Sequence, residues 1–106
     1  MPKYLVQASY SAEGLQGLKT DTASGRKAAV TKAIETLGGK VEAFYFSFGS
    51  DDVVIIADMP SNTAAASASI AVGSTGLARS HTTPLLTVEE ADQAITMKAN
   101  YRAPGK

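Results

Sequence analysis

Two adjacent aspartates, Asp51 and Asp52, form the first candidate for a chemical site. They stand directly before the apolar run VVIIA. Paired carboxylates can share a proton or hold a cation, but neighbours on a strand point to opposite faces, so these two would not converge. A hard cation also needs several converging oxygens, and no second acidic cluster lies nearby. Because aspartate is a favoured turn residue, we interpret the pair as the turn that starts a strand.

A second candidate surrounds His81, the single histidine of the chain. On a strand, His81 would share a face with Arg79 and Thr83. If that face lines a cavity, His81 could serve as a general base, and Arg79 could stabilise developing negative charge. The alternative is a structural histidine at a sheet surface or an interface. Ser80 is not a nucleophile paired with His81, because strand neighbours face apart.

Gln7 and Ser9 form a third polar pair, two residues apart in a short apolar-rich segment. On a strand they would share one face. That face either joins His81 inside a cavity or points to solvent, and the sequence leaves both possibilities open. The stretch GSTG at 73–76 has the composition of a phosphate loop, but it lacks the lysine and the strand-to-helix context. We interpret it as the end of a helix.

Alternating strand and helix patterns position these residues. Strands are predicted for residues 3–10, 40–48, 52–58 and 77–86, and helices for 23–37, 62–74 and 88–99. The glycine-containing stretch SAEGLQGLKTDTASG, residues 11–25, is predicted as a connecting turn that leads into the first helix. Ser61 is predicted to cap the second helix, and Thr87 with Glu90 has the spacing of a capping box for the third.

The order β-α-β-β-α-β with a terminal helix is that of a ferredoxin-like α+β fold. We expect a four-stranded antiparallel sheet with both main helices on one face. Residues 1–100 are predicted to form a single domain, and residues 101–106 a loose tail.

The strand at 52–58 is apolar on both faces, because Val53, Val54, Ile55 and Ile56 follow one another. An antiparallel sheet covered on one side alternates apolar and polar residues. The helices cover one face, and the terminal helix is too short to cover more than part of the other. We therefore predict that a second copy covers it, in a homodimer or a larger homo-oligomer.

Composition restricts the classes of partner. The chain has 106 residues, no cysteine and a formal net charge of zero. Without cysteine there are no disulfides, Cys-based zinc sites or thiol nucleophiles. The scattered basic residues argue against nucleic-acid binding. No apolar run approaches the length of a membrane helix, and the N-terminus lacks the pattern of a signal peptide. We expect a cytoplasmic protein that binds neither nucleic acid nor a membrane.

The predicted strands 40–48 and 52–58 are so close in sequence that they form a hairpin. Several motifs, in order along the chain, are similar to those of the GYD domain family, which is named for a Gly, a Tyr and an Asp around this hairpin. The main resemblance is the stretch 49–56, GSDDVVII, followed by Asp58-Met59-Pro60. The other matching segments are Tyr10 with Glu13-Gly14, Arg26, Leu37–Lys40, Thr82–Leu85 and Thr87–Glu90. The resemblance spans nearly the whole chain.

This resemblance implies a ferredoxin-like fold that assembles as a dimeric α/β barrel, and it implies no particular reaction. It places Asp52 at the aspartate position of the family, where the carboxylate would hold the mouth of the barrel together or contact a ligand. Asp51 stands where the family has its tyrosine, so no role of that tyrosine is carried over.

Three functions are compatible with these residues. We favour a homo-oligomeric module, small-molecule-binding or regulatory, that takes an apolar or aromatic ligand without a cofactor. Its candidate ligand contacts are Gln7, Ser9, Asp52, Arg79 and His81. The alternative, by analogy of fold, is a cofactor-independent enzyme of the monooxygenase or isomerase kind, with a cavity at the barrel interior and with His81 and Arg79 as candidate catalytic residues. A weaker third hypothesis is haem binding through His81.

Overall fold

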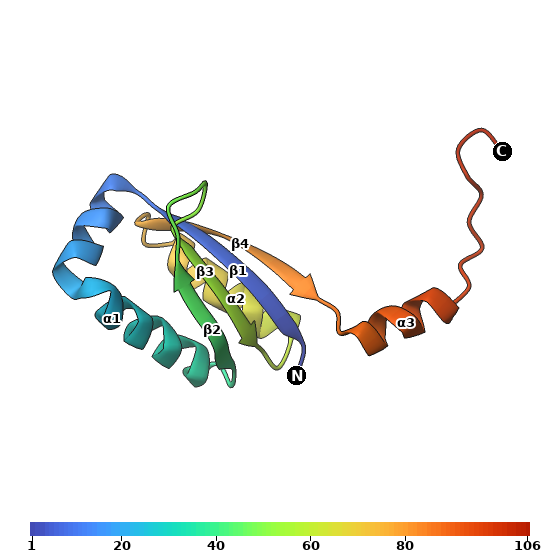
Figure 1. The fold of residues 1–106 in the computed structure, drawn as a ribbon, viewed down its shortest axis with the longest axis horizontal. Helices are drawn as coiled ribbons and strands as arrows, with labels where there is room; N and C mark the ends of the chain where they lie inside the picture. The colour runs from blue at the N-terminus through green and yellow to red at the C-terminus, as the bar shows by residue number, and fades with distance from the viewer.

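A computed structural model describes all residues from Met1 to Lys106. The chain forms a four-stranded antiparallel sheet and three helices (Figure 1), as expected for a ferredoxin-like α+β fold. In chain order the elements are β1 (Lys3–Tyr10), α1 (Ala12–Thr36), β2 (Lys40–Phe46), β3 (Val53–Asp58), α2 (Asn62–Gly73), β4 (Ala78–Leu85) and α3 (Val88–Thr96).

The sheet has the strand order β2-β3-β1-β4, so β1 lies in its interior between β3 and β4. Every neighbouring pair is antiparallel. The register sets Gln7 of β1 opposite Val54 of β3 on one side and opposite His81 of β4 on the other. Because side chains alternate along each strand, this register decides which residues share a face.

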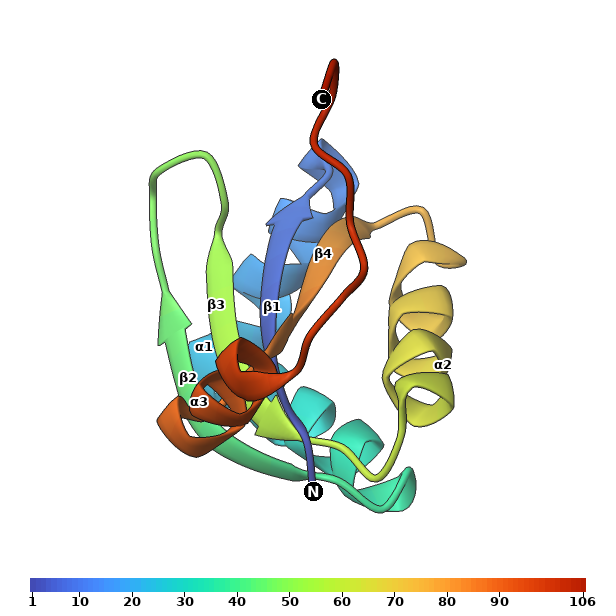
Figure 2. The same ribbon diagram turned by 90° about the vertical axis from the view of Figure 1, so that its right-hand side faces the viewer.

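One face of the sheet carries the core. Tyr4, Val53, Ile55 and Ala57 are buried there in one cluster, together with Ile34 of α1 and with Met59 and Ala65. Since residues of both α1 and α2 belong to this cluster, the two helices lie on the same face of the sheet (Figure 2). The opposite face, which we call the open face, carries no helix of its own chain.

Helix α1 is longer than the sequence predicted. It begins at Ala12, where the Ser11 hydroxyl accepts a hydrogen bond from the Gly14 amide at 3.0 Å. The expectation of a turn over 11–25 is therefore wrong. Gly14 is needed for a close approach rather than for a turn, because a Cβ at that position would lie 2.0 Å from the Leu77 carbonyl oxygen.

The first and second parts of α1 meet at a kink. Thr22 has φ 72° and ψ 165°, which interrupts the helical backbone. Its hydroxyl accepts a hydrogen bond from the Gly25 amide at 3.3 Å and so caps the second part. This cap lies inside a longer, bent helix.

Helix α3 extends beyond the end of β4, away from the body of the domain (Figure 1). All its side chains except Ala91 are exposed. Its start is the predicted capping box: the Thr87 hydroxyl accepts from the Glu90 amide at 3.0 Å, and the Glu90 carboxylate accepts from the Thr87 amide at 2.9 Å. None of the three helices combines the length and the apolar character needed to cross a bilayer.

Candidate functional site

The polar candidates on β1 and β4 are brought together on the open face. Gln7 lies opposite His81, and Ser9 lies opposite Arg79, in the register of the two strands. The sequence could place each pair on one face of its own strand, but it could not supply this register. The four residues form two adjacent cross-strand pairs, close enough for their side chains to act on one ligand.

Arg79 and His81 have no acidic partner in the chain. None of the three ion pairs of the chain includes Arg79 or His81. Both residues are exposed. An unpaired guanidinium beside an imidazole favours an anionic or hydrogen-bond-accepting group of a partner or a ligand at this end of the face.

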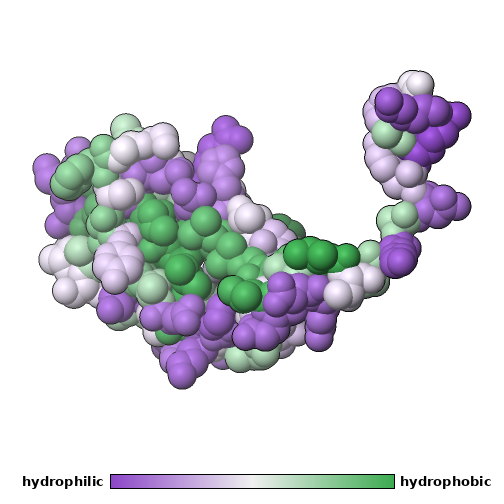
Figure 3. Space-filling view, turned by 45° about the vertical axis from the view of Figure 1, so that its right-hand side comes forward, coloured by the Kyte–Doolittle hydropathy of each residue, from purple (hydrophilic) through white to green (hydrophobic).

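The rest of the open face is mostly apolar. Leu5 lies opposite Ile56, Val54 lies opposite both Gln7 and Tyr45, and the side chain of Tyr45 is 68% exposed. Figure 3 is turned toward this face. It shows apolar residues gathered on the sheet domain, and again where the chain leaves that domain toward α3. The open face thus combines an apolar area with the polar cluster of β1 and β4.

Asp51 and Asp52 bind different partners and do not form a carboxylate pair. The Asp52 carboxylate accepts a hydrogen bond from the Tyr10 amide at 2.8 Å, and the Asp52 amide donates to the Ala8 carbonyl at 2.8 Å. The Asp51 carboxylate accepts from the Ser9 hydroxyl at 3.1 Å. Both aspartates therefore tie the β2–β3 turn to the end of β1, which agrees with the turn interpretation.

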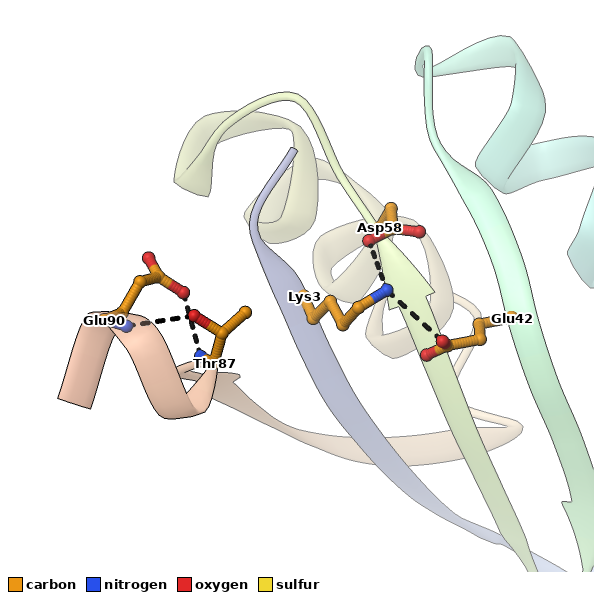
Figure 4. A network of polar contacts seen from close by, with 5 residues as sticks. All are labelled: Lys3, Glu42, Asp58, Thr87 and Glu90. Atoms are coloured by element: carbon orange, nitrogen blue, oxygen red, sulfur yellow. Dashed lines mark hydrogen bonds and ion pairs between the residues drawn. The ribbon is translucent and has the colours of Figure 1, made fainter. Parts of the chain in front are cut away.

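A three-residue ionic cluster occupies the other end of the open face (Figure 4). The Lys3 ammonium lies 3.0 Å from the Asp58 carboxylate and 3.3 Å from that of Glu42. Hydrogen bonds to Asp58 and then to Glu42 raise the pKa of Lys3 above its ordinary value. Sequence analysis missed this cluster, because it joins the ends of three strands whose register only the structure supplies.

A larger feature lies on the helix-covered face. A partly open hollow of about 550 Å³ separates α1 from α2 above the sheet, and 21 of its 31 lining residues are hydrophobic. Its floor is the core face of β1 and β3, and its walls include Val30 and Ala33 of α1 and Ala68 and Val72 of α2. Alanine and serine dominate α2, and these small side chains leave the space between the helices unfilled.

Polar side chains interact with one another on two sides of the hollow. On the α2 side, the Ser69 hydroxyl lies 2.9 Å from that of Thr82 and 3.4 Å from that of Ser80. On the α1 side, the Arg26 guanidinium is held by the Asp21 carboxylate at 3.2 Å. Both side chains of this ion pair line the hollow. The walls therefore offer a hydroxyl cluster and no unpaired charge.

The hollow and the predicted site residues lie on opposite sides of the sheet. Gln7, Ser9, Asp52, Arg79 and His81 do not line it. No group of three or more His, Cys, Asp or Glu side chains lies close enough together to hold a metal ion. The chain thus presents two separate candidate places, an apolar hollow under the helices and a mixed open face.

A family model described as GYD domain matches residues 4–95 of the chain. The chain belongs to the GYD domain family. The match covers all four strands except Lys3, the first residue of β1, and most of α3, so it includes both faces of the sheet. Separate comparisons with curated proteins and with solved structures found no match.

The two aspartates of the β2–β3 turn make hydrogen bonds within this GYD domain. In this GYD domain, the Asp52 carboxylate joins the turn to the backbone of Tyr10. Asp51 contacts Ser9 through its carboxylate, and its carbonyl accepts from the Ser47 hydroxyl within the turn. The structure thus gives the two residues local structural roles in this GYD domain.

Proposed function

We propose that this GYD domain is a homo-oligomeric module that binds a small, uncharged, largely apolar molecule in the hollow between α1 and α2. The observation that carries the proposal is the hollow itself, about 550 Å³ with mostly hydrophobic walls. Ligand pockets usually measure about 300–1,000 Å³ and combine apolar walls with a few polar groups.

The packing of the domain supports an occupant. Protein interiors are close-packed and contain few voids larger than a water molecule. Here the residues around the hollow include buried core members such as Tyr4 and Ile55. An apolar ligand would supply the dispersion contacts that these walls lack, and it would exclude water from the core.

The hydroxyl cluster and the ion pair at the hollow suggest the chemistry of the ligand. The hydroxyls of Ser69, Ser80 and Thr82 can donate to or accept from one hydroxyl or carbonyl group. Arg26 is already neutralised by Asp21, so the hollow offers no free charge to a carboxylate or an amine. An aromatic ketone, a phenol or a fatty alcohol has the required form.

The homo-oligomeric part of the proposal rests on the open face. Leu5, Val54 and Ile56 lie on it without cover from their own chain. A second copy that brought the same face against it would remove this apolar area from water.

Binding of N-phenyl-1-naphthylamine, an uncharged apolar fluorophore, tests the hollow. Ala68→Phe places a large ring in the hollow, and we expect it to weaken probe binding at least tenfold. Ala66→Phe is the matched control, because Ala66 is exposed on the same helix and does not line the hollow. Its affinity should stay within about twofold of the unsubstituted protein.

Ala33→Phe repeats the test from α1, at an exposed position on the wall, so it does not depend on repacking α2. Circular dichroism checks that each variant is folded. Equal probe affinity in all four proteins, or no probe binding by the unsubstituted protein, would contradict the proposal.

A second candidate function is favoured by the register of β1 and β4. The cross-strand pairs Gln7–His81 and Ser9–Arg79 would support a cofactor-independent reaction in the barrel interior, with His81 as general base and Arg79 stabilising an oxyanion. This function predicts that His81→Ala abolishes turnover of an aromatic or ketone substrate while leaving the thermal midpoint unchanged. Haem binding through His81 would instead give the purified protein a Soret absorbance band.

A further inference from the structure

The segment from Leu86 to Met97, which we call the arm, carries an apolar stripe without a partner in its own chain. Val88, Ala91 and Ile95 follow one another at spacings of three and four residues, so they lie on one side of α3. The side chains of Val88 and Ile95 are 76% and 79% exposed. Leu86 and Met97 extend the stripe at its two ends and are also exposed.

The arm is held away from its own domain. Only Leu86 and Thr87 separate the end of β4 from the start of α3, and Thr87 is fixed by the capping box (Figure 4). Such a short link leaves the helix pointing beyond the sheet edge, as Figure 1 shows. The apolar stripe and the open face belong to one chain but do not meet within it.

The open face matches the arm in charge as well as in polarity. Asp92 borders the stripe, four residues after Val88 and three before Ile95, while Glu89 and Glu90 lie on the other side of α3, which contains no basic residue. On the open face, Arg79 and His81 of β4 have no acidic partner. An arm lying along β4 of another copy would set the Asp92 carboxylate near these groups while its stripe covers the apolar area.

We propose that the arm of one copy packs across the open face of a second copy, beside β4, and that the second copy's arm does the same in return. This is helix docking through an apolar stripe with anchors at i, i+3 and i+7. Under a two-fold axis each arm contact occurs twice. The inference rests on the homo-oligomer of the proposed function and adds the element that holds it together.

Two substitutions in the full-length chain separate the stripe from the rest of α3. Ile95→Asp puts a carboxylate into the stripe, and Gln93→Asp puts the same carboxylate on the opposite side of the helix. Both residues are exposed, so neither change disturbs the core of a single copy. In sedimentation velocity over a range of concentrations, we expect Ile95→Asp to raise the dimer dissociation constant at least thirtyfold. Gln93→Asp should change it less than threefold.

Disulfide trapping tests where the arm lies. Because the chain has no cysteine, a chain with Ile95→Cys mixed with a chain with Thr83→Cys can form a mixed disulfide only between copies. Thr83 lies on the open face of β4. We expect that disulfide under mild oxidation, and none when Gln93→Cys replaces Ile95→Cys.

The outcomes distinguish this inference from the proposed function. If Ile95→Asp leaves dimerisation unchanged, the arm proposal is overturned while the homo-oligomer stands. If the unsubstituted chain stays monomeric at every concentration, both are overturned. If Ile95→Asp weakens the dimer but no mixed disulfide forms with Thr83→Cys, the docking surface is wrong.

Discussion

Asp52 fixes a junction of three strands at the scale of single residues. Its carboxylate and its amide both bind the end of β1, at Tyr10 and Ala8, while its carbonyl accepts from the Ser47 amide at 2.8 Å. One residue thus joins β1, β3 and the chain leaving β2. That role requires an acceptor on a short side chain, which explains why Asp, among the turn-forming residues, suits this position.

Asp52→Ala should therefore destabilise the domain. The Tyr10 amide would lose its acceptor at a partly buried place, which costs about 1–2 kcal/mol in the free energy of unfolding. Asp52→Asn keeps an oxygen acceptor and should cost less than half as much. Urea unfolding followed by circular dichroism measures both. If Asp52→Ala were as stable as the unsubstituted protein, the carboxylate would be free for a ligand role instead.

The sequence predicted that Asp52 belongs to a turn, but it did not predict the hydrogen-bond partner of Asp52. The alternation of side chains along a strand argued against a carboxylate pair, and in the structure Asp51 and Asp52 bind different partners. The partner of Asp52 lies 42 residues earlier in the chain, and no local pattern names it. For the same reason, the opposition of Gln7 and His81 depends on a register that the sequence does not contain.

At the scale of elements, the glycines of α1 are the reason why its first part was predicted as a turn. The stretch 11–25 contains glycines at 14, 17 and 25, a density that ordinarily indicates a turn. In the structure Gly14 lets the helix approach the Leu77 carbonyl, while Gly17 has open space around it. The order of strands and helices along the chain, α2 and the capping box of α3 were predicted correctly, because hydrophobic periodicity and caps are local signals.

These two glycines should respond to alanine in opposite ways. Gly17→Ala meets no atom within 4 Å and removes the entropic cost of glycine in a helix, so it should stabilise by about 0.5–1 kcal/mol. Gly14→Ala forces its methyl group against the Leu77 carbonyl oxygen and should destabilise by about 1–3 kcal/mol. Thermal unfolding of the two variants checks the signs. Equal effects would mean that α1 does not approach β4 as described.

Acid should weaken the capping box at the start of α3. The hydrogen bond from the Thr87 amide lowers the pKa of Glu90 below its ordinary value of 4.5. A lowered pKa means that the cap contributes fully above pH 4.5 and is lost as the pH falls through the folded-state value. In NMR spectra, the Thr87 amide signal should shift over this range. Glu90→Gln should remove most of the pH dependence and Glu89→Gln should keep it.

The largest unpredicted feature belongs to the whole molecule. The hollow depends on how far α1 stands from α2, and periodicity in a sequence predicts helices without predicting their separation. The alanine- and serine-rich composition of α2 was the one available signal. Burial is correspondingly sparse, since only nine of the 106 residues are buried in the single chain.

Stability should therefore depend on what fills and covers the domain. A ligand or a second copy that binds only the folded chain raises the midpoint of thermal unfolding by mass action. We expect the midpoint to rise with protein concentration and to rise further with saturating N-phenyl-1-naphthylamine. Ile95→Asp should remove the first dependence and Ala68→Phe the second. A midpoint that is independent of both would indicate a self-sufficient monomer.

The central place of β1 also affects how the chain folds during its synthesis. The first strand pairs with the last, and Lys3 lies opposite Leu85. Closing so long a segment carries a large entropic cost, and contacts so distant in sequence slow folding. The sheet cannot be completed on the ribosome until β4 has emerged, so until then β1 has an unpaired edge in the nascent chain. In this domain, β1 is made before the other three strands and is among the last to be fully paired.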